Sequence, residues 1–418
     1  MTDRGDPATV ALVPSPPTRL PLAGELPRAT TTVGGAVAAK GFRPFFLLAG
    51  VFAVALVPLW LAALQGWFDP GSYLGAMAWH GHEMVFGFAV AVIAGFLLTA
   101  AGNWTQRETA VGGALLALAG LWLAGRFAVL GATALPRGLP AVVDLAFLPA
   151  LAVALGRPIV AARNRRNYVM LAVVAALWLA NLTVHLDALG VLPGWRTRGN
   201  LLGVDVVIFV IVVMAGRIFP MFTRNATKVD SIRAIPALEI ASVAAAALLL
   251  VLDLARPDAK VTALVAGATG CILAARTWCW GARHSLRIPL VWILHAGYAW
   301  IPIGLLLRAI AAYSSAVLPM LATHALTVGA VGGLTLGMMS RVALGHSGRP
   351  LVVPWPVTAS FVLVTLAALA RVVTPMLDLD WYRSAVMVSG LTWAAAFALF
   401  VAVYAPILLS PRIDGKAG

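Results

Sequence analysis

About twelve long apolar blocks, each close to 20 residues, determine what this chain can fold into. A helix needs about 20 apolar residues to cross the roughly 30 Å hydrocarbon core of a bilayer. Alanine, leucine, valine and glycine dominate every block, whereas the strands of a membrane barrel would be short segments of alternating polarity. The sequence therefore predicts an all-α fold, a polytopic membrane helix bundle of about 12 transmembrane helices. The blocks lie near residues 45–65, 77–101, 111–131, 140–156, 168–189, 201–220, 236–254, 261–280, 288–310, 317–340, 355–374 and 384–409.

The composition excludes a water-soluble protein. Of the 418 residues, 61% are hydrophobic and 11% are charged, whereas soluble domains average about 25% charged residues. Residues 1–40 contain many Pro, Thr and Ala residues and no apolar run, so we expect a disordered cytoplasmic tail there and not a secretory signal. We expect one transmembrane domain over residues 41–410 and a short cytoplasmic tail over residues 411–418.

The net charge of +14 is explained by topology. With the N-terminus placed inside, the inner loops and tails carry about 21 of the 30 Lys and Arg residues, and the outer loops and helix ends carry about 7. This asymmetry is the positive-inside pattern of membrane proteins. We therefore predict that both termini are cytoplasmic. The basic residues face the lipid bilayer surface and form no nucleic-acid-binding site.

Ionisable residues within the apolar blocks are the strongest functional signal, because each costs about 2.5–3.5 kcal/mol at the centre of a bilayer. With the predicted topology, most of them fall in one layer beneath the outer surface, which we call the outer polar layer. His295 is predicted to lie in the inner third of its block instead. The outer polar layer contains His80, His82, Glu83, Arg126, Asp144, His185, Asp205, Arg308 and His324.

These residue types suit haem or copper. Neutral imidazole ligates haem iron and copper, methionine sulfur suits Cu(I), and arginine can neutralise haem propionates. His80, Glu83 and Met84 project from one face of a helix, whereas His82 lies about 200° around the helix from His80, so the two histidines should not bind one metal. The candidate metal ligands are His80, His82, Glu83, Met84, His295 and His324. The candidates for holding a haem or another cofactor are His80, His82, His185, His324, Arg126 and Arg308.

Structural roles are the alternative for many of these residues. A histidine inside the membrane can simply link two helices by a hydrogen bond. Asp144 with Arg126, and Asp205 with Arg308, can be structural ion pairs. The glycine-rich run 329–333 permits close packing of helices, and it could equally leave room for a flat macrocycle.

Two further patterns concern the helices themselves. Arg126, Arg256 and Arg371 each follow a Leu/Ala string in the third, seventh and eleventh blocks. This recurrence would fit three units of four helices, although an arginine at a helix end is also a common anchor at the membrane surface. Pro220 can end or kink the sixth helix.

Several long motifs resemble the NnrS family, in the same order along the chain. They are GFRPFF at 41–46, WHGHEMVFGF at 79–88, GFLLTA at 95–100, NWT at 103–105, RIFPMFTRN at 217–225, HALTVGA at 324–330, GLTLGMMSR at 333–341 and GHSGRP at 345–350. The resemblance spans nearly the whole chain except the first forty residues. It implies a bacterial inner-membrane protein of about twelve helices that contains haem and copper and is linked to denitrification and nitrosative stress.

From this resemblance we expect a protein of nitric oxide metabolism that binds nitric oxide or another diatomic, or relieves nitrosyl–metal complexes. A membrane or periplasmic electron donor would be its partner. The resemblance assigns neither the ligands nor a catalytic turnover. The alternative is a secondary transporter of a metal, haem or small anion with a histidine-rich outer site. A haem–copper reductase or oxidase is disfavoured, because such enzymes use an adjacent His-His pair, which the sequence lacks.

Overall fold

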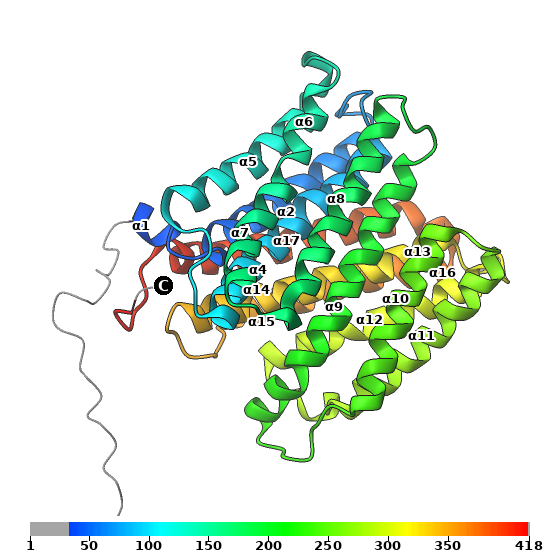
Figure 1. The fold of residues 1–418 in the computed structure, drawn as a ribbon. Helices are drawn as coiled ribbons and strands as arrows, with labels where there is room; N and C mark the ends of the chain where they lie inside the picture. The colour runs from blue at the N-terminus through cyan, green and yellow to red at the C-terminus, as the bar shows by residue number, and fades with distance from the viewer. Residues whose placement is uncertain (1–32, 417–418) are drawn as a thin grey trace, which may run out of the picture.

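The computed structural model describes residues 33–416, and within these residues it contains helices and no strands. Twelve spans among them are long and apolar enough to cross a membrane, which confirms the predicted all-α multi-span bundle (Figure 1). Spans 1 to 4 are α2 (Phe42–Leu64); α3 (Ala76–His82), η1 (Glu83–Ala89) and α4 (Val90–Thr105); α5 (Gly112–Leu130); and α6 (Leu139–Leu145) with α7 (Phe147–Ala161). Spans 5 to 8 are α8 (Tyr168–Ala188), α9 (Arg196–Thr227), α10 (Pro236–Ala255) and α11 (Ala259–Cys279). Spans 9 to 12 are α12 (Pro289–Ala311); α13 (Pro319–His324), η5 (Ala325–Gly332) and α14 (Gly333–His346); α15 (Trp355–Val372) with α16 (Thr374–Leu377); and α17 (Tyr382–Leu409).

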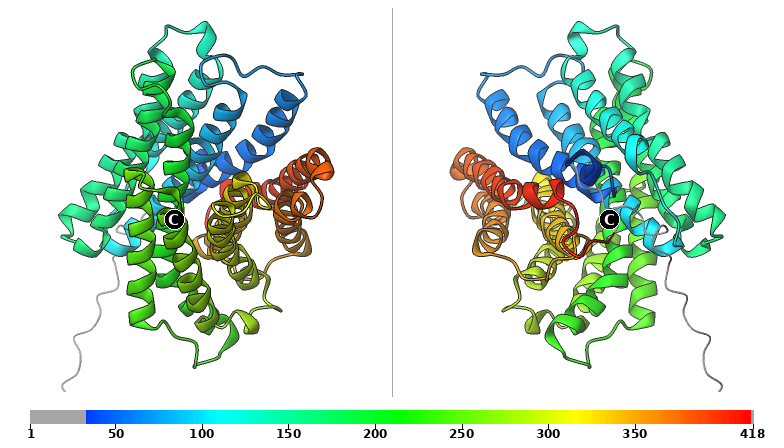
Figure 2. Two further views of the ribbon diagram at one scale, coloured as in Figure 1. Left: turned by 90° about the vertical axis from the view of Figure 1, so that its right-hand side faces the viewer. Right: turned by 90° about the vertical axis from the view of Figure 1, so that its left-hand side faces the viewer.

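The first and last spans pack side by side, so the described chain begins and ends at the same end of the bundle (Figure 2). Arg43 at the start of α2 is fully buried and donates from Nη1 to the carbonyl oxygens of Leu408 and Ser410, at 3.0 and 2.5 Å. These carbonyls belong to the last turn of α17, which lacks partners within its own helix. The GFRPFF motif therefore closes the bundle by joining its two terminal spans. We call the opposite end of the bundle the distal end.

Spans 2, 6, 9 and 10 form the centre of the bundle. Helix α9 contacts α3, η1 and η5, and α4 contacts α14. Buried residues make up 78%, 61%, 72% and 67% of the most apolar windows of these four spans, against 17% in the peripheral span 7.

Two of the central spans contain a π-helical segment directly after a histidine. The segment η1 follows His82, and η5 follows His324. Such wide turns are rare in helices and occur frequently at functional sites. In span 10, the rings of Trp300 and Trp393 fill the space beside Gly329 and Gly332. The glycine-rich run therefore serves close packing of side chains and leaves no room for a macrocycle there.

The structure differs from the sequence predictions at several boundaries. Residues 1–32 of the predicted tail lie outside the described residues, but packed structure already begins with α1 (Val33–Val37), and Ala36 and Ala38 are buried. Pro220 neither ends nor interrupts α9, which continues to Thr227. Proline is tolerated within membrane helices, where hydroxyl side chains and neighbouring helices satisfy freed backbone groups.

Candidate functional site

All members of the predicted outer polar layer lie toward the distal end of the bundle, but the structure divides them into three separate groups. The buried network contains Tyr73, His82, Glu83, Arg126, Asp144, Asn181 and His185. The histidine cavity is lined by His80, Met84, Met320, His324, Arg371 and Tyr382, together with apolar side chains and the neutral polar residues Thr197, Asn200, Thr323, Thr327 and Ser389. The arginine cavity is lined by Arg198, Asp205, Asp253, Arg256 and Arg308.

Arg126 joins the two carboxylates of the buried network. Its Nη1 donates to Oε1 of Glu83 at 2.9 Å, and its Nη2 pairs with Oδ1 of Asp144. Gly87 in η1 makes this approach possible, because a Cβ there would lie 3.2 Å from both the Arg126 and the Glu83 side chains. The ion pair of Arg126 with Asp144, one of the alternatives from sequence, is therefore present. Both terminal nitrogens of Arg126 are therefore bound to carboxylates, whereas its Nε has no partner among the described residues.

The two histidines of the buried network bind the other side of Asp144. His185 Nε2 lies 2.9 Å from Oδ2 of Asp144, and His82 Nε2 lies 3.3 Å from the same oxygen. His82 also lies 2.9 Å from Oδ1 of Asn181 and, through Nδ1, 2.9 Å from Oε1 of Glu83. Both ring nitrogens of His82 therefore face acceptor oxygens.

The prediction that Glu83 shares a face with His80 and Met84 is wrong for its carboxylate. The attraction of Arg126 and the hydrogen bond with His82 draw the Glu83 side chain into the buried network. His80 and His82 diverge as helical geometry requires, and they belong to different groups. Of His80, Glu83 and Met84, only His80 and Met84 line the histidine cavity.

One metal-ligating geometry is available inside the buried network. A ligand atom of each of His82, Asp144 and His185 lies within 4.8 Å of the other two. Two imidazoles and one carboxylate are a common set for transition metals. A metal at this position would have to replace the hydrogen bonds that now satisfy the same atoms, so the network is complete as a purely structural unit.

Tyr73 extends the buried network toward the distal loops. Its hydroxyl lies 2.8 Å from Nδ1 of His185. Burial raises the pKa of Tyr73 to about 12 from the usual 10.0, although the nearby Arg196 acts in the opposite direction. The phenol therefore keeps its proton across the neutral range and can donate to His185.

We expect Tyr73→Phe to lower the stability of the fold by about 1 kcal/mol at neutral pH, the usual contribution of one hydrogen bond. Because the pKa of Tyr73 is raised in the fold, its contribution is complete below pH 10 and is lost as the pH rises from 10 toward 12. Thermal unfolding of both proteins in detergent between pH 8 and 11.5 tests this. The difference between the proteins should narrow above pH 10, and a constant difference would contradict it.

The histidine cavity has a volume of about 280 Å³ and lies between spans 1, 2, 6, 10, 11 and 12. The ring of His80 stacks on that of Trp60, with 4.1 Å between centroids. Its Nδ1 atom is buried and has no hydrogen-bond partner among the described residues. A buried polar atom without a partner is costly, so a ligand in the cavity would satisfy a need that the protein itself leaves open.

His324 faces the same cavity with one nitrogen already committed. Its Nδ1 donates to the carbonyl oxygen of Met320 at 2.7 Å, one turn earlier in α13. This bond fixes the ring and assigns its remaining nitrogen, Nε2, the role of acceptor or metal ligand. Metal-binding histidines typically have such a partner. Met84 and Met320 line the cavity as well, so it combines two imidazoles with two thioethers.

The sequence analysis did not identify Arg371 and Tyr382 as site residues. Arg371 closes α15, is only 4% exposed and lines the histidine cavity. Its Nη2 donates to the hydroxyl of Tyr382 at 3.1 Å, and this hydroxyl donates in turn to the sulfur of Met320 at 3.2 Å. Arg371 follows a Leu/Ala string like those before Arg126 and Arg256, which was the only available signal.

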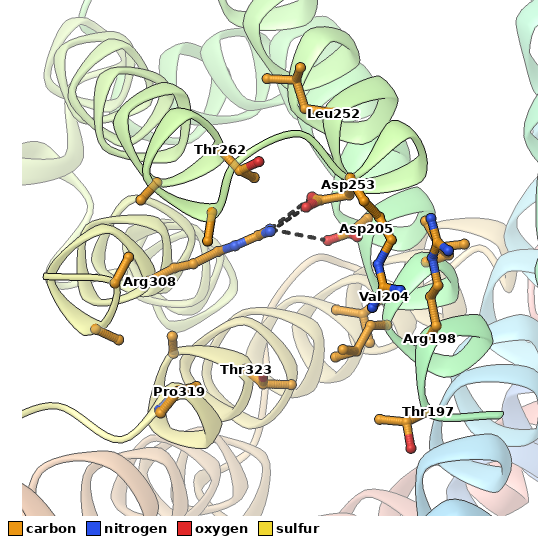
Figure 3. A pocket seen from close by; sticks show the side chains of 18 of the residues that line it. Thr197, Arg198, Val204, Asp205, Leu252, Asp253, Thr262, Arg308, Pro319 and Thr323 are labelled. Carbon is orange, nitrogen blue, oxygen red and sulfur yellow. Dashed lines mark hydrogen bonds and ion pairs between the residues drawn. The ribbon is translucent and has the colours of Figure 1, made fainter. Parts of the chain in front are cut away.

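The arginine cavity is larger, about 510 Å³, and lies beside the histidine cavity, with which it shares wall residues such as Val204 and Thr323. In Figure 3, Arg308 points across it toward two carboxylates. It binds Asp253 through both terminal nitrogens, and Asp205 lies 4.0 Å away. The predicted pairing of Arg308 with Asp205 is thus secondary to a pairing with Asp253, and Arg308 is not free for a propionate.

His295 stands apart from all three groups. It lies toward the other end of the bundle, where its Nε2 is 2.9 Å from the hydroxyl of Thr223. The ring packs against Phe219. Among the described residues, His295 belongs to no cluster of three potential metal ligands. The Thr223 bond links spans 6 and 9, as the structural alternative expects, and Nδ1 of His295 has no partner among the described residues.

Comparison with known proteins adds one finding. The family model described as NnrS protein matches residues 36–412, which is nearly the whole chain. No curated protein sequence matches the chain.

Proposed function

Because the chain belongs to the NnrS family of multi-span membrane proteins, we propose that it binds nitric oxide at a metal held between His80 and His324. Family membership fits a protein of nitric oxide metabolism or the nitrosative-stress response. The observation that carries the proposal is the histidine cavity, which His80 and His324 both line; Nδ1 of His80 has no partner, and the His324 ring is oriented by Met320.

Copper fits this cavity. His80 and His324 offer imidazole nitrogens, and Met84 and Met320 offer thioether sulfurs, a donor set that suits Cu(I). The cavity is slightly below the range of about 300–1,000 Å³ that is typical of sites for drug-sized molecules, which is ample for an ion and a diatomic ligand. When bound, the metal supplies an open coordination position for nitric oxide.

Haem, the second proposed cofactor, does not fit the histidine cavity alone. The neighbouring arginine cavity has sufficient volume, but no histidine or methionine lines it. A haem would need space from both cavities, where His80 or His324 would supply an imidazole to the iron and Arg198 would neutralise a propionate. This placement replaces the earlier expectation that Arg126 and Arg308 hold the propionates, because carboxylates already bind both.

The largely apolar lining of the histidine cavity suits an apolar gas. The apolar side chains of spans 1, 6 and 12 enclose it, and nitric oxide can enter from lipid without shedding a hydration shell. The bond between His324 and Met320 holds one ligand in place, and the stacking on Trp60 holds the other. We propose an inner-membrane location with both termini cytoplasmic, so that the cavity lies near the periplasm and within reach of an electron donor.

Metal analysis of the purified protein, with absorption and electron paramagnetic resonance spectra before and after nitric oxide is added, tests the proposed function. We expect about one copper per chain, as one set of two imidazoles and two thioethers implies, and a change of spectrum with nitric oxide. A Soret band would add haem. Protein that is folded but binds neither metal nor nitric oxide would contradict the proposal.

A secondary transporter is the second candidate, and the π segments in spans 2 and 10, which both line the histidine cavity, favour it. Internal repeats with interrupted helices at the substrate site are common in transporters, and the π segments η1 and η5 interrupt spans 2 and 10. A transporter would release its metal readily, whereas a resident centre would survive dialysis against a chelator. Retention of the metal therefore separates the two candidates.

A further inference from the structure

Arg371 carries a positive charge into the histidine cavity without a carboxylate to balance it. The residue is 4% exposed, and among the described residues it forms no ion pair. Its Nη2 binds the Tyr382 hydroxyl, and its guanidinium carbon lies 5.1 Å from the centre of the same ring. Its Nη1 is buried and has no partner.

The other three buried arginines of the described chain are Arg43, Arg126 and Arg276. Arg126 binds two carboxylates. Arg276 binds Glu239 and the carbonyl oxygen of Val212. Arg43 binds carbonyl oxygens at the end of α17, where the helix dipole is negative. Arg43 and Arg371 thus both lack a carboxylate and lie at a helix C-terminus, but of the four buried arginines it is Arg371 that lines the histidine cavity.

A buried charge in a membrane protein is normally paired, because an unpaired one is expensive at this depth. Tyr382 does not supply the missing charge, because its hydroxyl is neutral and already directed at the sulfur of Met320. The missing partner must therefore enter the cavity from outside the protein. It must be negative, and it must accept a hydrogen bond from Nη1.

We propose that Arg371 binds a small monovalent anion, of the nitrite or azide class, beside the proposed metal position. The single uncompensated positive charge fits one negative charge. The cavity of about 280 Å³ accommodates an ion of a few atoms, and its walls are largely apolar, which suits a weakly hydrated anion. Nitrite is the anion that oxidation of nitric oxide yields, so this inference deepens the proposed function and rests on it for the choice of ligand.

The anion site and the metal site can be tested separately. Isothermal titration of sodium nitrite and sodium azide into the full chain, purified in detergent and stripped of metal, measures anion binding without the metal. We expect saturable binding by the wild-type protein and at least about 30-fold weaker binding by Arg371→Gln, because a charge-assisted hydrogen bond is lost. Arg371→Lys keeps the charge and should bind with intermediate affinity.

Arg256→Gln is the matched control, because Arg256 lines the neighbouring arginine cavity and is exposed. It should bind the anions as the wild-type protein does. Loss of binding in this variant with retention in Arg371→Gln would overturn the assignment and place the anion in the arginine cavity. Absence of binding to the metal-free wild-type protein would overturn it as well, whatever the metal content of the purified protein.

Thermal unfolding supplies a second readout. An anion that binds only the folded protein stabilises it, so nitrite should raise the melting temperature of the wild-type protein and leave that of Arg371→Gln unchanged. If Arg371 instead bound a haem propionate, the variant would lose haem during purification, and added nitrite would stabilise neither protein. That result would contradict the proposal, even if the metal proposal were correct.

Discussion

Replacing His80 or His324 with alanine is expected to reduce bound copper to background while leaving the protein folded in the membrane. Each histidine supplies one of the two imidazoles in the cavity. Loss of even a supporting residue around a metal typically costs about 10–100-fold in affinity, and loss of a direct ligand should cost more. Metal analysis of each purified variant measures the effect, and size-exclusion chromatography reports whether it is folded.

The expected effect is confined to these two histidines. His295→Ala, which removes a histidine from the other end of the bundle, should keep its metal and serves as the matched control. His185→Ala tests the competing position, the set formed by His82, Asp144 and His185. Full copper occupancy in both His80→Ala and His324→Ala, together with loss in His185→Ala, would move the metal centre to the buried network.

Replacing Arg126 with leucine is expected to cause the largest loss of stability of any single substitution in the distal half. It would leave Glu83 and Asp144 buried without their common partner. Breaking a buried ion pair by removing one member typically costs about 3–5 kcal/mol. Unfolding in detergent, followed by circular dichroism, should show a markedly lower melting temperature and a poor yield of folded protein.

Arg308→Leu is the appropriate comparison, because Arg308 also binds two carboxylates but its side chain is 31% exposed. Water screens exposed ion pairs, which typically contribute about 0–1 kcal/mol. We therefore expect a much smaller decrease in melting temperature than for Arg126→Leu. Equal decreases in the two variants would show that burial does not set the strength of these pairs.

The sequence predicted the helices well because lipid imposes a simple rule on them. The length of apolar sequence needed to cross a bilayer is nearly constant, so spans such as α8 and α10 begin and end within about two residues of the predicted blocks, the usual error of such boundaries. The largest error was α9, whose polar ends extend beyond the apolar block at both sides. A hydropathy pattern detects the apolar part of a helix and does not detect its polar ends.

The depth of the polar residues was predictable for the same reason, but their partners were not. The direction of each span places His80, His185 and His324 at one end of the bundle. It does not say which helices are neighbours, so the division into a buried network and two cavities could not be foreseen. The π segments were also missed, and η1 changes the direction in which side chains such as Glu83 point.

Arg371 and Asp253 illustrate a second limit. Both lie near the ends of their helices, where a charged residue usually reaches water or lipid headgroups. The role of Asp253 depends on Arg308, which is more than 50 residues away in the sequence. The role of Arg371 depends on the histidine cavity that it lines. Only the packed bundle shows that one of these charges is balanced and the other is not.

Anomalous X-ray scattering at the copper edge, from crystals of the copper-loaded protein, tests the central claim most directly. The account predicts one strong peak in the histidine cavity, at bonding distance from ring nitrogens of both His80 and His324. A peak among His82, Asp144 and His185, or no ordered copper in a folded protein, would contradict it.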